Sequence, residues 1–122
     1  MLKWDPVAVM SCLEVLPVED EDAAGLEYTV MKSGMRLVLT VYPYHGDVSV
    51  SLYRDGVIDP ALSLNLFGCD AIRCIRFKGY DALEFGAGRL FAGHYDGDGP
   101  IPYGIRIRVM PSIAIDTFRY PV

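Results

Sequence analysis

Between Leu26 and Leu66 the chain alternates apolar and polar residues almost without a break. Apolar side chains stand at every second position in the segments 37–41, 48–52 and 62–66. A period of two residues is typical of β-strands that have one buried face and one wetter face. The pattern therefore predicts a series of strands joined by short loops.

The loop lengths follow if every apolar side chain must stay on one face, because residues paired across an antiparallel hairpin share a face. In the first hairpin, a two-residue loop at 33–34 pairs Leu26 with Val41. In the second hairpin, a four-residue loop at 44–47 pairs Val41 with Val50. Both loop lengths keep the apolar side chains of the paired strands on the same face of the sheet.

The third turn offers a choice between two loops. Asp55-Gly56 is a common two-residue turn, but it would pair Leu52 with Asp59 and mix the two faces. A three-residue loop at 54–56 pairs Leu52 with Ile58 instead and leaves the glycine where a left-handed conformation is needed. We therefore expect the three-residue loop.

Alternation returns near the C-terminus, over residues 105–109. A three-residue loop at 110–112 keeps Ile107 and Ile115 on one face and puts Arg106 opposite Asp116 on the other. We expect this arginine and aspartate to form an exposed ion pair, which contributes little to stability.

A weaker hairpin is expected between these blocks. Its strands are the segments 72–77 and 82–85, joined around residues 78–81. The alternation breaks at Cys74-Ile75, which is compatible with a β-bulge.

One helix is predicted before the strands. Asp5 suits the N-cap, Pro6 suits the first helical position, and Pro17 should end the helix. An apolar stripe at helical spacing consists of Val9, Cys12, Leu13 and Leu16. We expect an α+β, mostly β domain spanning residues 1–122, with this helix packed on a curved antiparallel meander sheet of about seven to eight strands. A β-sandwich or an open barrel is the alternative.

Composition narrows the class of protein. Of the 122 residues 52% are hydrophobic, which argues against disorder, and no apolar run approaches the roughly 20 residues that span a bilayer. The first residues lack the pattern of a signal peptide, and the three cysteines show no zinc-type spacing. We expect a cytoplasmic protein with unpaired thiols and no membrane contact.

The charge is concentrated at one end of the chain. Residues 1–35 contain seven acidic and two basic residues, which accounts for the whole formal charge of −5. An acidic run of Glu19, Asp20, Glu21 and Asp22 lies at its centre. Such a run is usually a solvated loop, and it would also attract a basic protein partner. Binding to nucleic acid is disfavoured, because the net charge repels phosphate.

Signatures of enzymes are mostly absent. The chain has no phosphate-binding glycine loop, no nucleophile elbow and no Cys-x-x-Cys motif, so no catalytic residue and no cofactor is expected. Two loops still carry groups that suit a divalent metal ion. These groups are His45, Asp47, His94, Asp96 and Asp98. They would form a site only if both loops lie at the same end of the sheet.

The face opposite the apolar set is the second candidate site. It would present Arg36, Tyr42, Ser49, Ser51 and Tyr53. Tyrosine and arginine are enriched in protein interfaces. We therefore expect a non-enzymatic protein-binding module, a profile that immunity proteins and toxin inhibitors fit, with self-association as a variant. The alternative is a small-molecule-binding or metal-dependent enzyme whose site lies at the His45/His94 loops.

Overall fold

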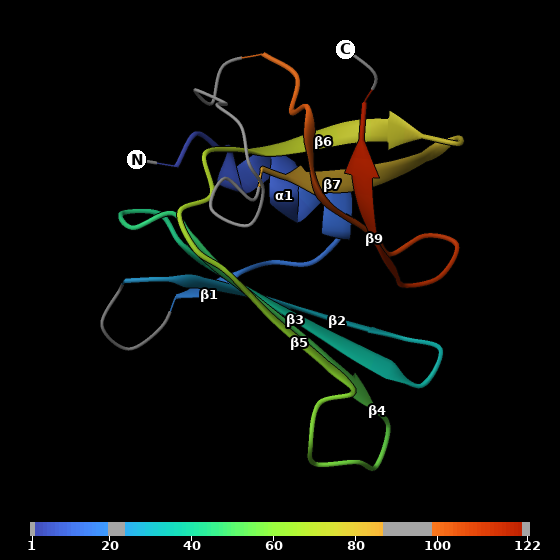
Figure 1. Cartoon of the computed structure of the whole chain (residues 1–122). Helices are drawn as coiled ribbons and strands as arrows, with labels where there is room; N and C mark the ends of the chain where they lie inside the picture. Colours follow the sequence, from blue (N-terminus) through green and yellow to red (C-terminus); the bar gives the residue numbers. More distant parts are fainter. Residues whose placement is uncertain (1, 20–23, 87–98, 121–122) are drawn as a thin grey trace.

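A computed structural model describes residues 2–19, 24–86 and 99–120. Within these ranges the chain forms one helix and two antiparallel sheets (Figure 1). The helix is α1 (Pro6–Leu13). The first sheet has the order β1 (Val18–Glu19), β2 (Leu26–Lys32), β3 (Met35–Tyr42), β4 (Asp47–Arg54) and β5 (Leu62–Leu66). The second has the order β6 (Ile72–Phe77), β7 (Tyr80–Phe85), β8 (Tyr103–Arg108) and β9 (Ala114–Arg119).

The prediction of a mostly β fold with a short N-terminal helix is confirmed, whereas the prediction of a single sheet is wrong. The strands divide into sheets of five and four, and β5 does not pair with β6. The helix and both sheets contribute to one hydrophobic core, whose members include Val9, Leu13, Leu39, Val50, Leu83, Phe85 and Ile107. Two sheets let each apolar face cover the other, which one open sheet covered by a short helix cannot do.

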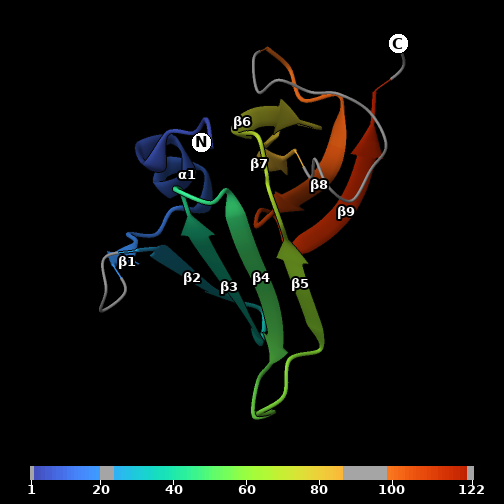
Figure 2. The same cartoon turned by 60° about the vertical axis from the view of Figure 1, so that its left-hand side comes forward.

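The two sheets are arranged unequally around the helix. In both views α1 lies on the same side of the molecule as the second sheet (Figures 1 and 2). The loop between β4 and β5 projects from the opposite end of the first sheet (Figures 1 and 2). The first sheet therefore extends well beyond the part that the helix and the second sheet cover.

The helix begins where it was predicted to begin and ends earlier. The carboxylate of Asp5 accepts a hydrogen bond from the Val7 amide at 2.9 Å, and Pro6 is the first helical residue. The helix ends at Leu13, because Glu14 adopts a left-handed conformation with φ of 60°. Leu16, predicted to belong to the core stripe, is consequently 77% exposed. None of the helices in the described part of the chain is long and apolar enough to cross a membrane.

The first hairpin has the predicted register, and the second is shifted by two residues. Leu26 lies opposite Val41, as expected. Val41, however, lies opposite Val48 rather than Val50. The four-residue loop begins at Pro43 and ends at Gly46, whose φ of +72° lets β4 begin at the next residue. A shift of two residues leaves every side chain on its expected face.

The third loop is longer than predicted. Leu52 lies opposite Leu62, and not opposite Ile58. The loop spans residues 55–61, and pairing resumes after Pro60, which has no amide hydrogen to donate to a sheet. The rejected pairing of Leu52 with Asp59 does not occur, and this shift again preserves the faces.

The second sheet confirms the C-terminal register and corrects two details of the weaker hairpin, whose loop consists of residues 78–79 rather than 78–81. Ile107 lies opposite Ile115 and Arg106 lies opposite Asp116, as the C-terminal alternation predicted. No bulge occurs at Cys74, which pairs with Leu83 in a continuous ladder along β6 and β7. Alternation is weak there because the adjacent strand β7 is buried on both faces from Ala82 to Phe85.

Candidate functional site

The first sheet presents a polar face that neither the helix nor the second sheet covers. We call this surface the outer face and define it by Arg36, Val38, Thr40, Tyr42, Ser49, Ser51, Tyr53, Ser63 and Asn65. Their side chains are half-buried or exposed, whereas the alternate positions Leu37, Leu39, Val48 and Val50 are buried. The five residues predicted for a binding face therefore share one side of two adjacent strands, β3 and β4.

The shifted register of the second hairpin sets the pairs on the outer face. Tyr53 lies opposite Arg36, and Tyr42 lies opposite Asp47. The Arg36 guanidinium consequently stacks over the Tyr53 ring, with its central carbon 4.4 Å from the ring centroid. This contact is a cation–π interaction that joins two side chains of the outer face.

A pocket of about 260 Å³ adjoins the outer face at the end of the sheet where β3 and β5 end and β4 begins. We call it the end pocket. Its lining residues are Tyr42, His45, Asp47, Val48, Ser49, Asn65, Leu66 and Phe67. The pocket therefore combines one carboxylate, one imidazole and two aromatic rings with the small polar side chains of the outer face.

Backbone contacts hold the end pocket in shape. The Gly46 amide donates to Tyr42 O at 3.0 Å, and the Cys69 amide donates to Gly46 O at 2.7 Å. The Gly68 amide donates to the Asp47 carboxylate oxygen Oδ1 at 3.3 Å. A Cβ atom on Gly46 would lie 2.7 Å from Cys69 O, so only glycine fits there. The loop between β3 and β4 is thus tied to the segment that leads into the second sheet.

The structure brings together only part of the predicted metal site. His45 and Asp47 both line the end pocket. His94, Asp96 and Asp98 lie outside the described residues. Across residues 2–19, 24–86 and 99–120, no group of three or more His, Cys, Asp or Glu side chains is arranged to hold a metal ion. The five-residue site remains a prediction.

The acidic run is described at one residue only. Glu19 ends β1 at the edge of the first sheet and is exposed. Asp20, Glu21 and Asp22 lie outside the described residues.

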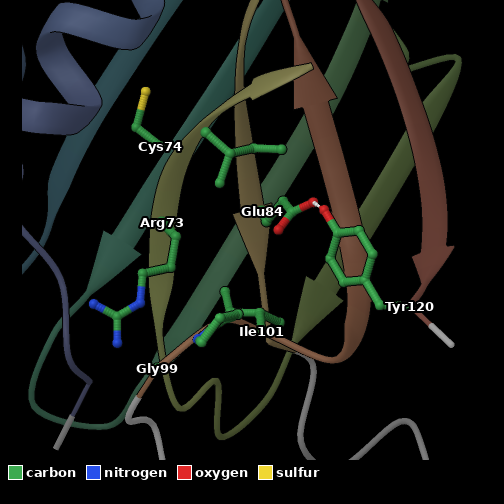
Figure 3. A pocket seen from close by; sticks show the side chains of 8 residues that line it. Arg73, Cys74, Glu84, Gly99, Ile101 and Tyr120 are labelled. Atoms are coloured by element: carbon green, nitrogen blue, oxygen red, sulfur yellow. Dashed lines mark hydrogen bonds between the residues drawn. The ribbon is translucent and has the colours of Figure 1, made fainter. Parts of the chain in front are cut away.

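Sequence reasoning missed a buried polar cluster on the second sheet. Glu84 in β7 is only 2% exposed and Arg106 in β8 only 8%. The Arg106 guanidinium donates to Glu84 Oε2 from Nη2 at 2.8 Å and from Nε at 3.1 Å. The Tyr120 hydroxyl donates to the same oxygen (Figure 3) and accepts from Arg106 Nη2 at 3.1 Å. The expectation of an exposed Arg106–Asp116 ion pair is therefore wrong.

Aromatic rings surround this cluster. The Arg106 guanidinium lies 3.9 Å from the Phe77 ring centroid and 4.8 Å from that of Phe118. Burial alone would lower the pKa of Arg106, but the bonds to Glu84 and Tyr120 outweigh it and raise the pKa. Burial, followed by the hydrogen bond to Glu84, raises the pKa of the Tyr120 hydroxyl, against the opposing effect of Arg106. The arginine stays charged and the phenol stays neutral.

A second pocket, of about 530 Å³, opens beside the cluster. Arg73, Cys74, Glu84, Ile101 and Tyr120 line it, and the Arg73 side chain points away from the Glu84 carboxylate (Figure 3). The Glu84 oxygen that binds Arg106 and Tyr120 is already committed to three donors. The cluster is therefore suited to fixing β7, β8 and the C-terminal residues in place rather than to proton transfer.

The two buried cysteines, Cys12 and Cys69, are not suited to act as nucleophiles. Cys12, Cys69 and Cys74 are all free thiols. Burial, aided by Cys74 and Asp81, raises the pKa of the Cys12 thiol. Burial, aided by Asp70 and Asp47, raises the pKa of Cys69 to about 12. Both thiols stay protonated near neutral pH, and a protonated thiol is a poor nucleophile.

A signal for the buried cluster is present in the sequence but is ambiguous. Glu84 stands between Leu83 and Phe85, and Arg106 stands between Ile105 and Ile107. Charged residues inside apolar strands signal a charged pair only if the two strands are known to be neighbours. The pairing of β7 with β8 joins segments separated by residues 86–102, and no hairpin pattern reveals it.

Comparison with known proteins finds one informative relationship. No family model and no curated protein matches the chain. A chain from the structure of a contact-dependent growth inhibition toxin–immunity protein complex of Klebsiella pneumoniae 342 is similar, with a TM-score of 0.73 and 15% sequence identity. The match covers 97% of this chain and 96% of that chain. The two proteins therefore share a fold over almost their whole lengths.

Proposed function

We propose that this chain is a non-enzymatic binding module of the immunity type, which binds a toxin domain in the cytoplasm and neutralises it. The observation that carries the proposal is the fold shared, end to end, with a chain of a toxin–immunity complex. The match covers almost the whole of both chains, so a partner would bind to surfaces of the shared fold itself and not to an added segment. The expectation from the sequence, a protein that acts by binding another protein, points the same way.

The outer face is the surface that we assign to the partner. It offers the stacked pair Arg36 and Tyr53 among small polar side chains such as Ser49 and Ser51. Arginine and tyrosine contribute large contact areas at protein interfaces, and a stacked pair loses less side-chain entropy on binding than two free side chains. The opposite side of this sheet is buried in the core and cannot serve.

Charge favours a basic partner. The formal charge of −5 comes from the first 35 residues, and Glu19, at the start of the acidic run, lies on the edge strand β1 of the same sheet. Complementary charge raises the rate of association and disfavours wrong partners more than it raises affinity. We therefore expect the association rate to fall as the salt concentration rises.

The test is a growth assay combined with a binding measurement. Toxin domains of the contact-dependent growth inhibition class from the same genome are expressed in cells with or without this chain, and each is titrated against the purified protein by calorimetry. We expect growth to be restored with one such domain, and binding of that domain alone. Growth inhibition by this chain itself, or the absence of binding to every domain, would overturn the proposal.

A matched pair of variants tests the surface. Arg36→Ala removes an arginine from the outer face, and Arg76→Ala removes an exposed arginine from β6 in the second sheet. We expect Arg36→Ala to weaken binding at least tenfold and Arg76→Ala to leave it unchanged. Light scattering of the free protein addresses self-association, and a dimer that dissociates on adding the toxin domain would fit the same face. If the two variants weakened binding equally, the outer face would not be the binding surface.

A further inference from the structure

We propose that the end pocket receives an arginine side chain of the protein partner. This inference rests on the proposed function, because it names the chemistry of a partner residue that docks beside the outer face. Tyr42 and Ser49 belong to both surfaces, so an arginine in the pocket would be continuous with the docked face.

The charge of the pocket selects a cation. Asp47 is an acidic lining residue, and none of the lining residues that the structure describes is a lysine or an arginine. The Gly68 amide binds Asp47 Oδ1 and so orients the carboxylate, while Oδ2 takes no part in that contact. The raised pKa of nearby Cys69, due to burial and then to Asp70 and Asp47, is a second sign of negative charge at this end of the sheet.

The shape of the pocket selects a long, flat side chain. Its aromatic residues are Tyr42, from the end of β3, and Phe67, which follows β5 and is 53% exposed. An aromatic ring attracts a guanidinium across its face, and a carboxylate binds the guanidinium edge with directed hydrogen bonds. The volume of about 260 Å³ is below the roughly 300 Å³ at which pockets for whole small molecules begin, so it suits one side chain.

The pocket is also rigid, which favours a strong contact. Gly46 cannot move away from Cys69 without breaking the 2.7 Å hydrogen bond between them, and the Asp47 carboxylate is fixed by Gly68. Residues that contribute most to binding tend to fill preformed pockets at interfaces, and arginine is prominent among them.

The first experiment uses the free protein and a small probe. N-acetyl-arginine amide is titrated into the protein, and amide chemical shifts are followed by NMR. N-acetyl-citrulline amide, which has nearly the same shape and no charge, is the control probe. We expect saturable shifts around Tyr42, Asp47 and Phe67 with the arginine probe and none with the citrulline probe. Equal shifts with both probes, or none with either, would overturn the proposal.

The matched variants are Asp47→Asn and Asp59→Asn. Asparagine at 47 keeps an oxygen for the Gly68 amide and removes the charge, so an unchanged melting temperature checks that the fold is intact. Asp59 is exposed in the loop between β4 and β5, at the far end of the sheet (Figure 1). We expect Asp47→Asn to weaken arginine-probe binding at least fivefold and Asp59→Asn to have no effect. Equal affinity in the two variants contradicts the assignment.

A second measurement separates this inference from the proposed function. If a toxin domain binds the wild-type protein, Asp47→Asn should weaken that binding roughly tenfold to thirtyfold. Binding of the toxin domain with equal affinity to the wild type and Asp47→Asn would overturn the pocket inference and leave the proposed function standing. Absence of any toxin binding, together with saturable arginine-probe binding, would overturn the proposed function instead.

Discussion

The two sheets of this protein handle polar residues in opposite ways. In β3 and β4 of the first sheet the buried positions are leucine and valine, and the serines, Thr40, Tyr42, Tyr53 and Arg36 face outward. The second sheet buries β7 from Ala82 to Phe85 and β8 from Gly104 to Ile107 on both faces, with Glu84 and Arg106 inside. Polar groups on an open face remain available to a partner, whereas those on a covered face must be paired within the chain.

Two arginines show what this difference means. Arg36 stacks on Tyr53 and Arg106 stacks on Phe77, so each makes the same type of contact with a ring. Arg36 is exposed and its charge is solvated, whereas Arg106 is buried and its charge is balanced by Glu84. The same side chain is thus available for binding in one sheet and is required for stability in the other.

The largest expected effect follows from removing the buried arginine. Arg106→Met leaves the Glu84 carboxylate buried without its partner, and we expect the free energy of unfolding to fall by about 3–5 kcal/mol. Replacing both residues with methionine should restore more than half of that loss, because no unpaired charge remains buried. Urea denaturation of the two variants measures the difference. A loss below about 1 kcal/mol for the single variant would contradict the buried pair.

The next effect tests the connection between the sheets. Gly46→Ala adds a methyl group 2.7 Å from Cys69 O at a φ of +72°, and Gly56→Ala adds one at a φ of +77° with no atom within 4 Å. The left-handed conformation alone costs about 1–2 kcal/mol, and overpacking adds about 1–3 kcal/mol. Thermal unfolding should therefore show a larger loss for Gly46→Ala. Equal losses would mean that the contact with Cys69 can relax freely.

A smaller effect depends on pH. The Tyr28 hydroxyl, fully buried, donates to Pro6 O at 3.2 Å and so joins the first sheet to α1. Burial, followed by the charge of Asp5, raises the pKa of Tyr28 from 10.0 to about 12. The folded state therefore favours the neutral phenol, and this stabilisation is complete below pH 10 and is lost as the pH rises through about 12.

The variant that checks this is Tyr28→Phe. We expect it to lose about 1 kcal/mol at neutral pH, from the missing hydrogen bond, and to show a shallower fall in melting temperature between pH 10 and 12. Melting curves at several pH values provide the measurement. If the melting temperature of Tyr28→Phe fell as steeply at alkaline pH as that of the wild type, groups other than Tyr28 would cause the fall.

The smallest expected effect on stability follows from a change on the outer face. Arg36→Met removes an exposed stacking contact and should cost about 0.5–1 kcal/mol. The same change at position 106 is expected to cost several times more, so the two variants compare the sheets directly. If Arg36→Met destabilised the protein as much as Arg106→Met, the outer face would be part of the structural core and not a free surface.

The period-two pattern predicted the two faces of the first sheet correctly even where it predicted the wrong pairs. The hairpin around Pro43–Gly46 and the loop that contains Pro60 both shift the register by an even number of residues. Leu39 and Val50 therefore stayed buried, while Tyr42 and Ser49 stayed on the outer face. Loop conformation depends on a few residues and is therefore hard to predict from the sequence. The face on which a side chain lies is specified by every second residue of a strand.

The sequence by itself determined the composition of the two faces of β3, β4 and β5, the start of the helix after Asp5 and the C-terminal register that sets Arg106 opposite Asp116. The tertiary structure decided that β5 and β6 do not pair, that Arg106 binds Glu84, and that Phe67 joins Tyr42 and Asp47 at one pocket. The physical reason is the separation in sequence over which each interaction acts. Periodicity and capping act between residues close in sequence, whereas sheet assignment, buried ion pairs and pockets depend on which distant segments come together to exclude water.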